Sequence, residues 1–260
     1  MSFAAHPEWF SWREGLRRRL LTRLSARRAA RVITVSDFSK REIVRHLRIP
    51  ASKVDVIYSA VTAGTAAGEP SLPRQPLVLY VGSLFNRRHV PALVEGFARL
   101  LRTHPDARLD IVGDNRTRPH IDVDAVIARA NAGDRIRARS YVGDDELAAL
   151  YRRAAVFVFL SEYEGFALTP LEALGAGVPV VLLDTAVARE IYGPAAIYVE
   201  RPDPAAIATA LARVLDSDAG RQRLLAAAAA QLQRFSWTEC AQRTLQILLS
   251  SARQARAVAS

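Results

Sequence analysis

SEYEGFALTPLEALGAGVPVV, residues 161–181, is the stretch of this chain that decides the fold. It starts at the end of the apolar segment AVFVFLS (155–161), whose pattern predicts a strand buried on both faces. A helix is predicted over 169–177, where a glycine closes it, and PVVLLD (179–184) predicts the next strand. A strand, a helix and a strand in this order predict a parallel sheet that helices cover on both faces.

The same alternation continues outward from this stretch. Upstream, LVLYVGS (77–83) and ARLDIVGD (107–114) predict strands, and 91–104 and 145–154 predict helices. We therefore expect an α/β domain over 77–234, followed by a helix over 235–260 that packs back on the N-terminal part of the chain.

The segment before residue 77 predicts a second, smaller body. RVITVS (31–36) and VDVIYSAV (54–61) predict strands, and Ser39 with Glu42 has the spacing of a capping box that opens a helix between them. Residues 62–76 are rich in Gly, Pro and small side chains, which is typical of a linker. We therefore expect one body over 1–61 and a linker over 62–76.

The first 30 residues predict an amphipathic helix, in which Trp9, Trp12, Leu16, Leu20 and Leu24 recur at steps of three and four. Arginines occupy its other faces. A helix that lies on a membrane surface and a helix that packs within the protein both remain open.

Composition excludes several classes of function. The chain has 36 Lys and Arg against 26 Asp and Glu, a net charge of +10, which suits nucleic acid, anionic lipid or phosphate-bearing ligands equally. Its arginine clusters lack a helix-turn-helix or interleaved aromatic residues, so we expect no nucleic-acid partner. Cys240 is the only cysteine and the five histidines lack metal-ligand spacing, so we expect neither a disulfide nor a metal site. Without a signal or bilayer-spanning segment, a cytoplasmic protein is expected.

Glu164 and Glu172, with seven residues between them, flank a predicted loop at the carboxyl end of the sheet, where ligands bind in open α/β folds. A helix that starts at Thr169 would offer free amides to an anion. Thr169 and Glu172 also have capping-box spacing, and that spacing taken alone favours a structural cap.

The residues around these two glutamates resemble glycosyltransferase family 4. Residues 161–181 are similar to the family's block of two glutamates separated by seven residues. The resemblance continues through VLYVGSLFNRRHVPALVEGFARL (78–100), RLDIVGDNR (108–116) and YVGDDELAALYRRAAVFVFLS (141–161). Residues 31–61 resemble the end of the family's N-terminal domain, so the resemblance covers nearly the whole chain.

This resemblance implies a GT-B architecture, in which two Rossmann-like domains face a cleft and the C-terminal one binds a nucleotide sugar. By the family pattern Glu172 binds the ribose, Glu164 lies beside the donor sugar as the catalytic residue, and Arg88 occupies the basic position that contacts the diphosphate, with Arg87 next to it. Two arginines can replace a divalent metal. No cofactor is expected. The implied donor-binding residues are Gly82, Ser83, Arg87, Arg88, Asp114, Val142, Glu164, Gly165, Phe166, Ala167, Leu168, Thr169 and Glu172.

The implied reaction is retaining transfer of a hexose, such as mannose, from a nucleoside-diphosphate sugar to a glycan or lipid-linked acceptor in bacterial cell-surface polysaccharide synthesis. Ser83 and Ala167 stand where the family often has Arg and Gly. The family's first glycine-rich loop has no counterpart, so 1–61 is expected to be a remnant of the acceptor-side domain. The N-terminal segment would then contact a partner chain or the inner membrane face.

Two other functions remain as alternatives. The first is a donor-binding half that is inactive without a partner or the absent part of the domain. The second is a sugar-nucleotide epimerase, which shares the architecture but is disfavoured by the pair of glutamates.

Overall fold

A computed structural model describes residues 1–61 and 75–259, and side chains as far as residue 254. The predicted linker, 62–76, lies outside the described residues except for its last two positions. Contacts within the chain divide it into two compact units: Met1–Ala60 together with the chain from Phe235 onward, and Val61–Arg234. Each unit is described by itself.

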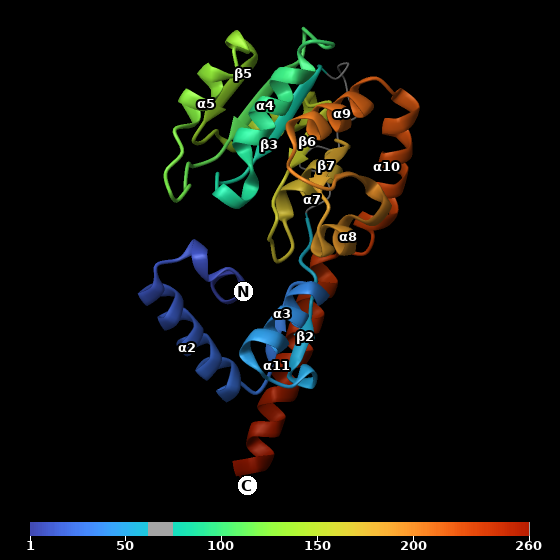
Figure 1. Ribbon diagram of the computed structural model, residues 1–260. Helices are drawn as coiled ribbons and strands as arrows, with labels where there is room; N and C mark the ends of the chain where they lie inside the picture. Colours follow the sequence, from blue (N-terminus) through green and yellow to red (C-terminus); the bar gives the residue numbers. More distant parts are fainter. Residues whose placement is uncertain (62–74, 260) are drawn as a thin grey trace. The chain divides into compact units, whose positions relative to one another are not determined.

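The larger unit is built on a parallel sheet of six strands in the order β5-β4-β3-β6-β7-β8 (Figure 1). The strands are β3 (Leu77–Val81), β4 (Arg108–Val112), β5 (Ile136–Arg139), β6 (Val156–Phe159), β7 (Val180–Leu183) and β8 (Ala196–Val199). Every residue of β3, β6 and β7 is buried, as the apolar runs of the sequence predict. The predicted α/β fold with a parallel sheet is thus confirmed.

Helices flank this sheet and follow its strands in sequence. They are α4 (Val90–Leu100), α5 (Val123–Arg129), α6 (Asp144–Arg153), α7 (Leu168–Gly175), α8 (Ala186–Tyr192), α9 (Pro204–Leu215) and α10 (Asp218–Leu232). Four of them begin after a side chain that accepts a hydrogen bond from a backbone amide of the first turn; these caps are Asp122, Thr185, Asp203 and Ser217. In contrast, α4, α6 and α7 begin without such a cap.

The smaller unit contains a two-stranded parallel sheet of β1 (Val32–Thr34) and β2 (Val54–Val56). Its helices are α1 (Ser2–Ala5), α2 (Trp12–Arg28), α3 (Asp37–Leu47) and α11 (Trp237–Ala259). The capping box predicted at Ser39 and Glu42 is wrong, because α3 starts earlier and the hydroxyl of Ser36 accepts from the amide of Ser39 at 3.0 Å.

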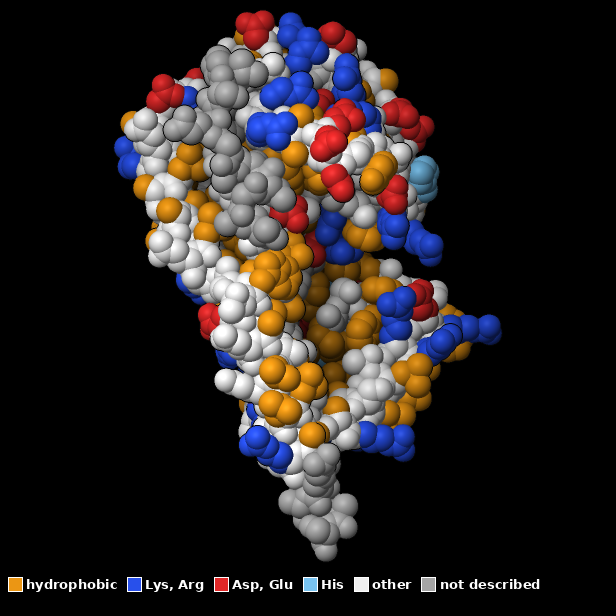
Figure 2. All heavy atoms as spheres, turned by 180° about the vertical axis from the view of Figure 1, so that it is seen from behind, with side chains coloured by type: hydrophobic (Ala, Val, Ile, Leu, Met, Phe, Trp, Pro, Cys, Tyr) orange, Lys and Arg blue, Asp and Glu red, His pale blue; other side chains and the backbone are white. Residues whose placement is uncertain are grey.

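Large apolar side chains lie on the surface of this smaller unit (Figure 2). On α2, the indole of Trp12 is 73% exposed, and the leucines one, two and three turns further on are exposed as well. On α11 the exposed apolar residues include Trp237, Leu245 and Leu248. No helix in the described part of the chain is both long enough and apolar enough to cross a bilayer.

Candidate functional site

The candidate site lies at the carboxyl ends of β3 and β6, which are neighbours in the sheet. After β3 the strand order continues through β4 toward one edge of the sheet, and after β6 it continues through β7 toward the other edge. Such a switch point leaves a crevice between the loops that follow the two strands. Here those loops are 82–89, which contains the short 3-10 turn η3 (Asn86–Arg88), and 160–167.

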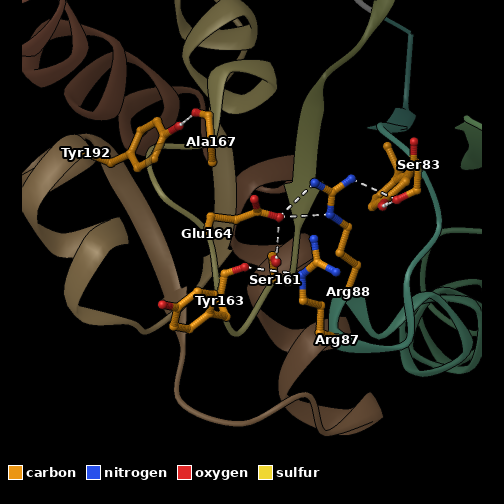
Figure 3. A network of polar contacts seen from close by, with 9 residues as sticks. Ser83, Arg87, Arg88, Ser161, Tyr163, Glu164, Ala167 and Tyr192 are labelled. Carbon is orange, nitrogen blue, oxygen red and sulfur yellow. Dashed lines mark hydrogen bonds and ion pairs between the residues drawn. The ribbon is translucent and has the colours of Figure 1, made fainter. Parts of the chain in front are cut away.

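An ion pair between Arg88 and Glu164 joins the two loops (Figure 3). Both Nε and Nη2 of Arg88 donate to Oε1 of Glu164, at 2.9 and 2.7 Å. The hydroxyl of Ser161 donates to the same oxygen at 2.8 Å. The two charged side chains are only 13% and 16% exposed, so solvent screens this pair weakly.

Aromatic rings and a carbonyl complete the surroundings of Arg88. Its guanidinium carbon lies 4.8 Å from the ring centroid of Phe159 and 5.3 Å from that of Phe85, distances at which a ring face attracts a cation. Its Nη1 donates to the carbonyl of Ser83 at 2.8 Å. Beneath them Tyr80 donates to the same carbonyl at 3.2 Å, and burial raises the pKa of Tyr80 to about 12.

Two glycines make room for this arrangement. Gly82 has φ +143°, and a Cβ there would lie 2.9 Å from Nη1 of Arg88. Gly113, at the end of β4, has φ +153°, and a Cβ there would lie 2.1 Å from the carbonyl oxygen of Gly82. Any side chain at either position would therefore displace the loop or the arginine.

Arg87 is also fixed between the two loops. Its Nε donates to the carbonyl of Tyr163 at 3.3 Å, and its own carbonyl accepts from the amide of Glu162 at 3.0 Å. Its guanidinium carbon lies 4.2 Å from the ring centroid of Phe85. Burial lowers the pKa of Arg87 from its ordinary value, with Arg88 contributing a smaller effect of the same sign. The site therefore holds two like charges close together.

Glu172 lies inside α7 and does not cap it. The helix begins at Leu168, its N-cap is Ala167, and it has no side-chain cap hydrogen bond. The capping-box interpretation of Thr169 and Glu172 is therefore wrong. The carboxylate of Glu172 instead accepts a hydrogen bond from the hydroxyl of Tyr151 at 3.2 Å, and burial together with this carboxylate raises the pKa of Tyr151.

Ala167 adopts a backbone conformation that favours glycine, with φ +67°. The hydroxyl of the buried Tyr192 donates to its carbonyl (Figure 3). The glycine that the family often has at this position thus has a structural reason, and in this chain an alanine takes the strained conformation.

The structure brings some of the predicted site residues together and leaves others apart. Gly82, Ser83, Arg87, Arg88 and Glu164 form one cluster. Asp114 pairs with Arg116 at 3.1 Å on the neighbouring loop. The remaining predicted residues lie after β5, between Glu164 and α7, or in the first turns of α7: Val142 and Phe166 are buried, Leu168 is exposed, and Gly165 and Thr169 are half-buried.

Several residues of the cluster were not predicted from the sequence, namely Phe85, Phe159, Ser161, Tyr163 and Tyr192. Ser161 and Tyr163 lie close to Glu164 in sequence, and this position is a signal that could have identified them. Phe85, Phe159 and Tyr192 carry no such signal, because in the sequence they look like ordinary core residues.

Comparison with solved structures shows that the chain has a fold of the GT-B type. Anabaena Alr3699/HepE, solved in complex with UDP and glucose, superposes with a TM-score of 0.79 over 95% of this chain and 70% of that one, at 20% sequence identity. Sucrose-phosphate synthase from Thermosynechococcus elongatus gives a TM-score of 0.72 over 93% of this chain and 62% of that one, at 23% identity.

Family models agree with the fold. The model described as Glycosyl transferases group 1 matches residues 67–231, and that of Glycosyltransferase Family 4 matches residues 3–65. The chain belongs to the group 1 glycosyltransferases, as the resemblance of its motifs predicts.

Comparison with two relatives shows what fraction of their length this chain spans. O-antigen chain mannosyltransferase B of Escherichia coli is 30% identical over 231 residues, which are 82% of this chain and 59% of that protein. A glycogen synthase of Mycobacterium tuberculosis is 33% identical over 236 residues, 86% of this chain and 55% of that protein. The chain therefore spans less than two thirds of the length of these relatives.

Proposed function

We propose that this chain carries the donor site of a retaining glycosyltransferase that moves a hexose from a nucleoside-diphosphate sugar to a glycan or lipid-linked acceptor. The observation that carries the proposal is the cluster of Arg87, Arg88 and Glu164 at the switch point of the sheet. The uncapped start of α7 follows the same loop and supports it.

The two arginines match the chemistry of the leaving group. When a nucleoside diphosphate departs, negative charge grows on its phosphate oxygens, and fixed cations stabilise that transition state. Guanidinium groups bind such oxygens through paired N–H donors, and the N-terminus of α7 adds backbone donors. We therefore propose that Arg87 and Arg88 take the place of a divalent metal and that no cofactor is needed.

The two glutamates would bind the rest of the donor. All three hydrogen bonds to Glu164 fall on Oε1, and in Figure 3 the other oxygen points away from both arginines. We propose that this second oxygen contacts the donor sugar. Glu172 lies in α7, the helix that follows this loop. Its carboxylate would accept hydrogen bonds from the ribose hydroxyls, while the hydroxyl of Tyr151 holds the carboxylate in place.

The nature of sugar and acceptor is proposed from the relatives. Escherichia coli and Salmonella typhimurium proteins named as O-antigen chain mannosyltransferases match this chain, which supports mannose as the sugar and a cell-surface polysaccharide as the product. Such an acceptor fits an enzyme that works at the inner face of the cell membrane.

A second candidate is a donor-binding module that transfers sugar only with a partner chain. The exposed apolar side chains of the smaller unit, among them Trp12 and Leu16, favour this reading, because exposed apolar patches commonly mark interaction surfaces. Turnover by a monodisperse monomer, or only after addition of a partner, would separate the two candidates.

Calorimetry with a panel of nucleoside diphosphates in EDTA tests the donor site. At least one should bind, and Arg88→Ala should weaken it by about 1.5–3 kcal/mol, the range for hydrogen bonds to charged groups. Arg129→Ala, an exposed arginine on α5, is the matched control and should bind normally. Failure of all nucleotides to bind the folded protein would refute the proposal, and the anomeric configuration of a transferred sugar would test retention.

A further inference from the structure

The turn η3, which carries Arg87 and Arg88, is too short to fix its own position. Within the turn, the amide of Arg88 bonds to the carbonyl of Phe85 at 2.9 Å and that of His89 to the carbonyl of Asn86 at 3.1 Å. No side chain caps its N-terminal end. Short 3-10 turns have poor hydrogen-bond geometry, so the placement of the two arginines depends on what holds the turn from outside.

One side of the turn is held by the loop after β6, through the contacts of both arginines with Tyr163 and Glu164. The other side faces residues 113–121, the loop after β4. The backbones of the two loops are paired beyond the ends of their strands: the amide of Leu84 donates to the carbonyl of Asp114 at 2.7 Å, and the amide of Arg116 donates to the carbonyl of Leu84 at 2.8 Å.

The loop after β4 is internally braced. Oδ1 of Asn115 accepts from the amide and the hydroxyl of Thr117, at 3.2 and 2.7 Å, while its Nδ2 donates to the carbonyl of Ile121 at 2.8 Å. The amide of Ile121 donates to the hydroxyl of the buried Thr117 at 2.8 Å. These hydrogen bonds fix the conformation of the loop, so that another segment can be held against it.

Asn86 is the side chain that joins the turn to this surface. Its Oδ1 accepts from the backbone amide of Arg118 at 2.5 Å, and its Nδ2 donates to the carbonyl of Pro119 at 3.3 Å. Both bonds reach across 32 or 33 residues of sequence.

We infer that Asn86 is a positioning residue, which ties η3 to the loop after β4 and so holds Arg87 and Arg88 where a diphosphate meets both. This inference rests on the proposed donor site. Asn86 sits next to Arg87 in the turn, so freeing it lets the turn rotate and lets the two like charges move apart. A site that binds an anion through fixed donors loses affinity when those donors must be ordered first.

The test compares Asn86→Ala with the unchanged chain in calorimetry with a nucleoside diphosphate and with the corresponding monophosphate. The preference for the diphosphate over the monophosphate should fall about two- to tenfold, the range of one net hydrogen bond, because the nucleoside contacts are untouched. The melting temperature should stay close to that of the unchanged chain, since both bonds are exposed.

Arg118→Ala is the matched control. Asn86 bonds the backbone at position 118, so this variant keeps both bonds and removes only an exposed guanidinium; its preference should be unchanged. If Arg118→Ala lowers the preference for the diphosphate as much as Asn86→Ala does, the loop acts through its charge. If Asn86→Ala weakens the binding of the diphosphate and the monophosphate equally, Asn86 has a merely structural role. Either result overturns the inference, as does an unchanged preference in Asn86→Ala. Absence of nucleotide binding by the unchanged chain would refute the proposed function instead.

Discussion

Replacing Glu164 with Gln should strengthen the binding of a nucleoside diphosphate, although Glu164 is itself proposed as a donor-site residue. In the free protein Glu164 neutralises Arg88 through two hydrogen bonds, at 2.9 and 2.7 Å. A diphosphate that binds Arg88 has to compete with this carboxylate. Glutamine keeps the size of the side chain and an acceptor oxygen but removes the charge, so the phosphates meet an arginine without a counter-ion.

The size of both effects follows from the charged hydrogen bonds that Arg88 loses in Glu164→Gln. A hydrogen bond to a charged group contributes about 1.5–3 kcal/mol net, and a pair that is only 13% and 16% exposed keeps most of that strength. The unfolding free energy of the variant should fall by about this amount. Where the diphosphate restores the missing counter-charge, the affinity should rise by about tenfold for each 1.4 kcal/mol recovered.

Calorimetry with the nucleoside diphosphate, a thermal melt and a sugar-transfer assay together test this reasoning. The diphosphate should bind Glu164→Gln more tightly, the melting temperature should fall, and transfer should be slower because the contact to the sugar is lost. Glu162→Gln is the control: it removes the same charge two residues away, but its carboxylate pairs with His89 at 3.2 Å rather than with Arg88. Weaker diphosphate binding by a folded Glu164→Gln variant would refute the competition between carboxylate and phosphates.

Three further predictions concern the same site. Glu172→Gln should weaken nucleotide binding with the melting temperature near that of the unchanged chain, since Glu172 caps nothing; an unchanged Kd would assign it a structural role alone. Ala167→Gly should raise the unfolding free energy by about 0.5–1 kcal/mol in denaturant titration, because glycine adopts φ +67° without strain; destabilisation would show that the alanine side chain contributes packing. Nucleoside diphosphate affinity should change less than twofold between EDTA and added Mg²⁺; a large gain with Mg²⁺ would show that a metal shares the work of Arg87 and Arg88.

The interior of the larger unit could be predicted from the sequence because its strands are continuous apolar runs. Strands β3, β6 and β7 are buried on both faces, so their sequences are uninterrupted apolar runs that can be recognised locally. The edge strands β5 and β8 escaped prediction. In β5 charged residues alternate with apolar ones over only four positions, and Arg137 is paired in register with Asp110 of β4, so its identity as a strand depends on a neighbour.

The candidate site was predictable only in part, for a related reason. Glu164 and Glu172 lie on one loop and the helix that follows it, so their spacing carries a signal. The partner of Glu164, Arg88, is 76 residues away, and the support of Asn86 comes from a loop 32 residues further on. Such pairings depend on the order of strands in the sheet, which no local periodicity records.

The proposed diphosphate site has to hold its cations close together before the ligand binds. In this fold Arg87 and Arg88 are each held by their own set of partners. Glu164 neutralises Arg88, a backbone carbonyl accepts from each of the two guanidinium groups, and aromatic rings lie against both. All of these partners come from β3, β6 and the loops that follow them, strands that are adjacent in the sheet. In the proposed donor site, phosphate oxygens would replace some of these partners when the diphosphate binds. Under the proposed function, the strand order that buries the core thus also determines where the diphosphate binds.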